Sequence, residues 1–104
     1  MAIERTLIKR IERTIPDAFV GGHKMDIKLV FSIFRISHKF LSSKWTSYKV
    51  DRSVPYIEDP MYDGEYNTNR RLQVIERMME EEVRTAIRED EDRISQARAS
   101  RQNV

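Results

Sequence analysis

Two histidines are the side chains best suited to acid–base chemistry, because an unperturbed imidazole titrates near neutral pH. His23 follows the pair Gly21-Gly22 in a predicted turn, where it could bind an anion at a helix start. His38 lies in the most apolar segment and is expected to be a packed side chain. Neither stands at a recognisable spacing from acidic residues, and no Walker-type loop, GxGxxG, HExxH, GxSxG or calcium loop occurs. The sequence therefore predicts no catalytic residue, no small-molecule substrate and no enzymatic function.

Two acidic runs, 80–82 and 89–92, offer carboxylates of the kind that bind hard cations. Consecutive positions on a helix point in different directions, so neither run is expected to chelate a metal ion. The chain has no cysteine, which excludes disulfides and thiolate metal sites. We expect neither a metal nor an organic cofactor.

Positive charge gathers in the first half of the chain, where it lies along one flank of a predicted helix. Serine hydroxyls accompany it and could donate to phosphate oxygens, and a tryptophan could stack on unpaired bases. The candidate nucleic-acid residues are Lys24, Lys28, Arg35, Lys39, Lys44 and Trp45. An ordinary solvated helix face with a core tryptophan is the alternative interpretation.

An acidic, tyrosine-rich segment between residues 54 and 66 is suited to docking, because tyrosine offers a large contact area with little rotamer entropy to lose. An apolar stripe on the last predicted helix includes methionines, which adapt to partner helices. The candidate protein-interaction residues are Tyr56, Tyr62, Tyr66, Leu72, Ile75, Met78, Met79, Val83 and Ile87. Packing of both segments within their own chain is the alternative.

The elements that would position these residues are predicted from apolar periodicity. In the first segment the apolar side chains fall within one arc of about 140° at 100° per residue, which predicts an amphipathic helix over residues 2–15. Pro16 is expected to end this helix. The residues of the arc are Ile3, Leu7, Ile8, Ile11 and Ile15.

The segment 26–45 supports two interpretations. As a strand, its odd positions from 25 to 33 are apolar and alternate with mostly polar ones. As a helix, its polar side chains share one arc of about 100°, and the pattern continues past Ile33 to include Phe40, Leu41 and Trp45. The helix accounts for more residues, so we favour a central helix over 26–45.

Periodicity stops between residues 47 and 68, where Pro55, Pro60 and Gly64 predict an irregular loop. A helix is predicted over 69–99, with a frayed tail at 100–104. The predicted fold class is therefore mainly α: one domain, residues 1–104, with three helices, a long C-terminal helix and a long tyrosine-rich connection. The alternative is an α+β fold with a short hairpin from residues 24–34 and 44–50.

The composition bounds the class of protein. With 104 residues, 39% hydrophobic and 35% charged, the chain can form only a modest core, which favours an elongated or oligomeric protein. Net charge is +2, but residues 1–50 carry ten Lys and Arg against four acids, whereas 51–104 carry nine Arg against thirteen acids. This polarity favours contact between copies or separate partners for the two ends.

The N-terminus lacks the apolar core of a signal peptide, and no apolar run approaches the roughly 20 residues that span a bilayer. We expect an intracellular, soluble protein of the cytoplasm or of a host-cell cytoplasm, with no membrane partner. The expected function is a non-enzymatic protein–protein interaction module, an oligomerising adaptor, scaffold or regulator of a size common among viral and phage proteins. Its expected partners are a second copy of itself and another protein. A small nucleic-acid-binding regulator is the alternative.

Overall fold

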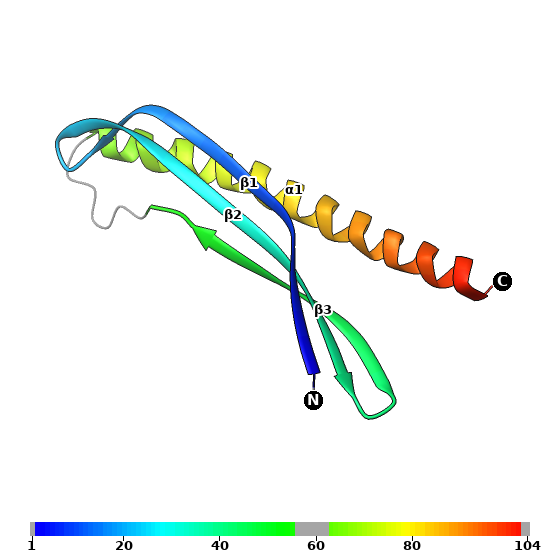
Figure 1. Cartoon of the computed structure of the whole chain (residues 1–104). Helices are drawn as coiled ribbons and strands as arrows, with labels where there is room; N and C mark the ends of the chain where they lie inside the picture. Colours follow the sequence, from blue (N-terminus) through cyan, green and yellow to red (C-terminus); the bar gives the residue numbers. More distant parts are fainter. Residues whose placement is uncertain (1, 56–62, 103–104) are drawn as a thin grey trace.

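The structure, a computed structural model, describes residues 2–55 and 63–102, with side chains for 2–55 and 67–100. Three strands, β1 (Ala2–Val20), β2 (His23–Phe40) and β3 (Ser43–Ser53), precede one helix, α1 (Asp63–Gln102). The strands form an antiparallel sheet in the order β1-β2-β3, and α1 lies along one face of this sheet (Figure 1).

The prediction of a mainly α fold is wrong, because residues 2–15 and 26–45 form strands and turns of the sheet. In β2 the alternation prevails: Ile27, Leu29, Phe31 and Ile33 are all buried on one face, which a helix could not achieve. The alternative hairpin is also in the wrong register: β3 pairs with residues 30–40 of β2, and within 24–34 only Ile33 and Phe34 pair with residues of 44–50. Neither interpretation of the sequence placed a strand at the N-terminus.

The sequence of β1 has a helix-like pattern because several of its apolar residues are four positions apart. This spacing fits the 3.6-residue period of a helix and also the two-residue period of a strand. The side chains of Ile3 and Leu7 lie on the uncovered face of the sheet. A register shift between Leu7 and Lys9 then exchanges the faces, so that Ile11 is buried under α1. The helical arc therefore combines residues from two opposite faces of a bulged strand.

Pro16 lies within β1 and does not end an element. It occupies a second register shift, between Ile15 and Ala18, on an edge strand where a missing N–H group breaks no ladder. The next residue, Asp17, has a φ of 51°, and its backbone N–H donates to the Asp26 carboxylate at 3.1 Å. The irregularity is thus a bulge with its own hydrogen bond.

Two short turns join the strands. Gly21 and Gly22 have φ values of 58° and 80°, the left-handed conformation that a two-residue hairpin turn requires at both central positions. The β2–β3 turn contains Leu41 at a φ of 54°, where a side chain is unfavourable, and this leucine is 82% exposed. The β2–β3 turn therefore carries a strained, solvent-facing apolar residue.

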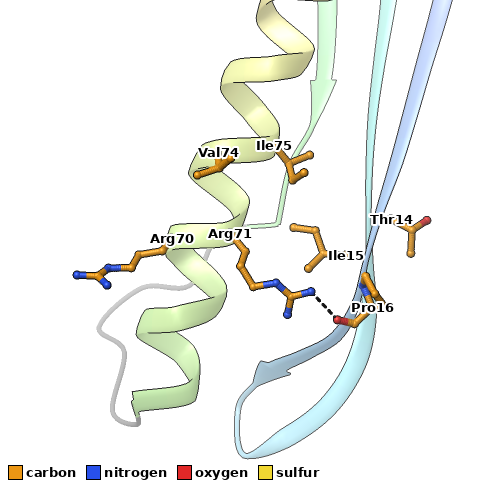
Figure 2. Close-up of a pocket in the computed structure, with 7 residues that line it drawn as sticks. All are labelled: Thr14, Ile15, Pro16, Arg70, Arg71, Val74 and Ile75. Carbon is orange, nitrogen blue, oxygen red and sulfur yellow. Dashed lines mark hydrogen bonds between the residues drawn. The ribbon is translucent and has the colours of Figure 1, made fainter.

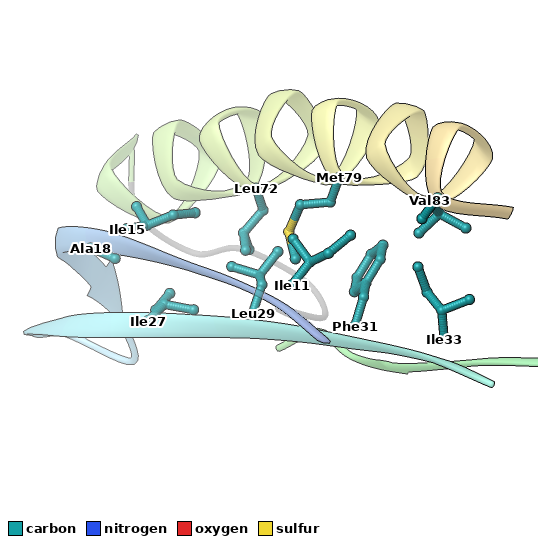
Figure 3. Packing of buried hydrophobic residues seen from close by; sticks show 11 residues of the cluster. Ile11, Ile15, Ala18, Ile27, Leu29, Phe31, Ile33, Leu72, Met79 and Val83 are labelled. Atoms are coloured by element: carbon teal, nitrogen blue, oxygen red, sulfur yellow. The ribbon is translucent and has the colours of Figure 1, made fainter. Parts of the chain in front are cut away.

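The core lies between α1 and the sheet (Figure 3). Apolar side chains spaced at three, four and seven residues along α1 meet the buried residues of β1 and β2. Beyond this cluster, Thr68 of α1 is buried and its hydroxyl accepts from the Phe19 backbone N–H at 2.9 Å. The buried core residues of the helix are Leu72, Met79, Val83 and Ala86, and those of the sheet are Ile11, Ile15, Ala18, Ile27, Leu29, Phe31 and Ile33.

The helix is longer than predicted. Residues 47–53 of the predicted loop belong to β3, α1 begins at Asp63, and residues 100–102 of the predicted tail are helical. The molecule extends 62 × 26 × 16 Å, and its radius of gyration of 19.0 Å exceeds the roughly 13 Å of a compact domain of this length. No helical segment within the described residues is long and apolar enough to cross a membrane.

Candidate functional site

The sheet has one covered and one uncovered face. Residues directly opposite each other on neighbouring strands have their side chains on the same face of the sheet. Phe34, Ile36 and His38 of β2, with their partners on β1 and β3, are on the face that α1 does not cover. Apolar side chains gather toward the β2–β3 turn on this open face, where Ile3 is 62% and Leu7 53% exposed. We call Ile3, Leu7, Phe34, Ile36, Phe40 and Trp45 the open-face patch.

Charged residues on the open face are paired with one another. The Asp51 carboxylate contacts Arg5 at 3.1 Å and Lys49 at 3.7 Å, and the Arg5 guanidinium lies 3.8 Å from the centre of the Phe34 ring. Glu12 makes a second group with Arg10 and Lys28. Both signs of charge are therefore present beside the open-face patch.

The tryptophan of the patch has an ordered environment. Trp45 and His38 are cross-strand neighbours whose rings stack with centres 5.0 Å apart and planes 1° from parallel. His38 Nε2 is also 2.8 Å from the Ser47 hydroxyl. The imidazole is therefore held in place between an aromatic ring and a hydroxyl group.

On the covered face, a polar network ends the apolar core. Asp90 of α1 is 1% exposed, and its carboxylate accepts from Arg35 Nη1 and from the Tyr48 hydroxyl, both at 2.8 Å. Arg93 of the same helix adds a contact of 3.2 Å. Three donors therefore compensate one buried charge and connect α1 to β2 and β3.

The network shifts two pKa values. Burial by itself would raise the pKa of Asp90, but hydrogen bonds from Tyr48, Arg35 and Arg93 outweigh it and hold this pKa below its usual value. Burial, followed by the hydrogen bond to Asp90, raises the pKa of Tyr48 from 10.0 to about 12. The phenol therefore stays protonated as a donor while Asp90 stays ionised.

We expect the Tyr48 phenol to titrate at about pH 12 in the folded protein. Its raised pKa contributes stability that is complete below about pH 10 and is lost as pH rises through about 12. The measurement is the tyrosinate absorbance of the wild type minus that of Tyr48→Phe, with circular dichroism to follow folding. A difference curve with its midpoint near 10 in folded protein would contradict the network.

A polar cleft lies at the end of the molecule where α1 and the β2–β3 hairpin diverge (Figure 1). Its volume is about 520 Å³, and Lys39, Lys44 and Arg98 line it together with Glu4. Its remaining lining residues are Ala2, Ile3, Ser37, His38, Trp45 and Thr46. We call it the tip cleft.

A smaller hollow of about 320 Å³ lies between β1 and the first turns of α1 (Figure 2). Arg71 Nη2 donates to the Pro16 carbonyl oxygen at 2.8 Å and fixes one side, while Ile15, Val74 and Ile75 supply apolar walls. Few polar groups converge on it, so it has no arrangement suited to chemistry. Within the described residues, no three acidic or histidine side chains lie close enough to hold a metal ion.

The predicted protein-interaction residues separate in the structure. Leu72, Met79 and Val83 are buried under the sheet, and Ile75 and Ile87 are half-buried against the same core, so their stripe is intramolecular packing. Their neighbour Met78 is 61% exposed and lies on the flank of α1, beside Lys9 of β1. The side chains of Tyr56, Tyr62 and Tyr66 lie outside the described residues.

The predicted basic stripe does not exist as one flank of a helix. Arg35 contacts Asp90 on the covered face, Lys28 contacts Glu12 on the open face, and Lys24 lies beside the β1–β2 turn. The structure does bring Lys39, Lys44 and Trp45 together, at the tip cleft. His23 begins β2 after the glycine turn and does not begin a helix.

The sequence does not predict two features of the structure: the buried carboxylate that pairs with Arg35 and the apolar side chains of the open face. Asp90 belongs to the acidic run 89–92, for which the sequence predicts no site, although a charged residue in register with buried positions is a signal of a buried network. Ile3 and Leu7 fall in the predicted helix over 2–15, and Phe34 and Ile36 in that over 26–45, although the structure places all four on the uncovered face of the sheet. Comparison of the chain with protein-family models, curated proteins and solved structures finds no match.

Proposed function

We propose that this chain is a non-enzymatic protein-interaction module that pairs with a second copy of itself through the open-face patch. The observation that carries the proposal is the one-sided sheet: α1 covers one face, while Ile3 and Leu7 are more than half exposed on the other. Sheets that expose apolar side chains on a face ordinarily bury them against a second layer.

The extent of the open face is suited to a dimer. A strand rises about 3.3 Å per residue, and neighbouring strands are about 4.8 Å apart. The three strands alongside residues 30–40 of β2 therefore present a flat area of roughly 35 × 14 Å, or about 500 Å², without counting the added surface of the side chains. Each partner of a standard interface buries about 800 Å² of accessible surface, which is of the same order. A patch of this size can support a specific but modest association.

The charges favour a second copy as the occupant. A twofold interface brings identical patches together, so a self-complementary surface needs both signs of charge. Asp51 and Glu12 on the open face each lie beside two cations, which allows a carboxylate of one copy to approach a cation of the other. A face of one sign would repel itself.

The strained turn supports a contact at the same end. Leu41 keeps a left-handed φ of 54°, although glycine would adopt it without strain. Leu41 and its chain neighbour Phe40 are 82% and 50% exposed, so this end of the sheet presents apolar surface to solvent. Strain at an exposed apolar position is typical of a residue retained for a contact and not for folding.

We expect light scattering to give the wild type twice the chain mass of 12.4 kDa at micromolar concentration. Leu7→Lys places an ammonium group in the interface and is expected to weaken pairing about 100-fold, so that this variant has the mass of one chain. Met78→Lys is the matched control, because Met78 is similarly exposed but belongs to α1 and lies outside the open-face patch.

Three results would contradict the proposal. A wild type with the mass of one chain at all accessible concentrations removes the dimer. Loss of pairing in Met78→Lys, with Leu7→Lys unaffected, moves the interface to the helix. Equal loss in both variants assigns the effect to added charge and not to the open-face patch.

A further inference from the structure

Most cations on the sheet are paired with carboxylates, but those of the tip cleft are not. Arg35 contacts Asp90, Lys28 contacts Glu12 and Lys49 contacts Asp51. No ion pair joins Lys39 or Lys44 to any carboxylate within residues 2–55 and 67–100. The tip cleft is thus lined by positive charge that the described carboxylates do not neutralise.

The register makes this arrangement unfavourable for the protein by itself. Lys39 and Lys44 are directly opposite each other on neighbouring strands, and like charges in such pairs repel. Arg98 comes from the last turns of α1 and adds a third cation to the same cleft. Glu4 is the one carboxylate among the ten lining residues, so the lining keeps an excess of positive charge.

The chemistry of the walls favours a ligand that is held by charge. Among the lining residues only Ala2, Ile3 and Trp45 are apolar, whereas Ser37 and Thr46 offer hydroxyl donors beside the lysines. A peptide usually needs a buried apolar anchor for affinity. A nucleic-acid strand needs none, because binding of its phosphates by Lys, Arg and hydroxyl groups releases counterions.

We propose that the tip cleft binds the phosphate backbone of single-stranded nucleic acid, with Lys39, Lys44 and Arg98 as the phosphate-contacting residues. The lining residues come from α1 and from the strands beside the β2–β3 turn, which diverge toward this end of the molecule (Figure 1), so an extended strand can approach the cleft from there. The two surfaces share Ile3 and Trp45, but this inference does not rest on pairing through the open-face patch, because Lys39 and Lys44 belong to the covered side of the sheet.

The test is fluorescence anisotropy of a labelled single-stranded oligothymidylate titrated with the full chain across a range of salt concentrations. Three phosphate contacts predict a log–log salt slope of about −2 for a single strand, or about −0.7 for each contact. Lys44→Gln is expected to weaken binding about 3- to 10-fold at low salt and to reduce the slope by about 0.7.

Lys49→Gln is the matched control, because it removes the same charge from the same strand. Lys49 lies on the open face beside Asp51, away from the cleft, so this variant should bind like the wild type. Thermal melting by circular dichroism checks that each variant is folded. The monomeric Leu7→Lys variant should also bind, which separates this proposal from the dimer.

Several results would overturn the inference. Absence of an anisotropy change at low salt removes the site. Equal weakening by Lys44→Gln and Lys49→Gln reduces the binding to general electrostatic attraction. Displacement of the oligonucleotide by polyglutamate at equal charge concentration assigns the cleft to acidic polypeptides and not to nucleic acid.

Discussion

Replacing Phe31 by alanine should lower the free energy of unfolding by about 3–5 kcal/mol, a large share of the stability of a domain of this size. Phe31 is 0% exposed at the centre of the core, between α1 and the sheet, so its removal leaves a cavity that neighbouring Leu29 and Ile33 cannot fill (Figure 3). Urea denaturation measures the change, at one low protein concentration so that self-association contributes little.

Phe34→Ala is the matched control, because it removes the same side chain from the same strand on the opposite face. Phe34 is half-buried and contacts the Arg5 guanidinium, so we expect a loss of only about 1 kcal/mol. The contrast depends on the alternation of β2: if that segment were a helix, the two phenylalanines would not divide in this way. Equal losses would show that the covered face of the sheet is wrongly assigned.

The Asp90→Ala variant should lose about 3 kcal/mol, because truncation leaves Arg35 and Tyr48 facing a site without their acceptor. Arg35 keeps 27% of its side chain exposed, which lets water compensate part of the loss. Chemical denaturation at neutral pH measures the change. Asp92→Ala, an exposed carboxylate two residues along α1, is the control and should change stability by less than about 0.5 kcal/mol.

The Asp90→Ala variant also tests how the free energy of unfolding depends on pH in the acidic range. The pKa of Asp90 is lowered in the folded protein, so its contribution is present above the ordinary pKa of an unfolded aspartate and is lost as pH falls through the folded value. The difference in unfolding free energy between wild type and Asp90→Ala should therefore shrink as pH falls below about 4. A difference that is independent of pH would show that Asp90 acts by packing and not by its charge.

The sequence predicts the helix better than it predicts the strands. Residues 69–99 were assigned to a helix because Leu72, Met79 and Val83 recur at a helical period, and they lie within α1. The first strand is predicted as a helix because apolar residues spaced four apart fit both the helical and the strand period. In addition, the bulge after Leu7 moves the following side chains to the other face of the sheet, and the local sequence does not indicate this bulge. Residues of β1 are a strand because they pair with β2, and the local sequence of β1 does not show this pairing.

The candidate surfaces were predicted only in fragments. Lys39, Lys44 and Trp45 were chosen together as a basic and aromatic group, and they do meet at the tip cleft. Their companion Arg98 is 54 positions beyond Lys44 in the chain, so only the return of α1 along the sheet brings it near. Leu72 and Met79, two of the predicted protein-interaction residues, are buried, and the exposed apolar side chains are instead those of Ile3 and Leu7. A wrong secondary structure for residues 2–15 predicts the wrong exposed face.

The Gly21-Gly22 turn also bears on the order in which the chain can assemble. From this turn the antiparallel β1–β2 ladder extends from Val20 opposite His23 to Ala2 opposite Lys39, with two register shifts along it. Each new pair closes only a slightly longer loop than the last, so the ladder can form by progressive zipping with little entropy lost at any one step. Docking of α1 joins Phe19 to Thr68, 49 positions apart, and is the long-range step. We therefore expect the hairpin to form before α1 docks on it, with Phe31 and its neighbours exposed to water until that step.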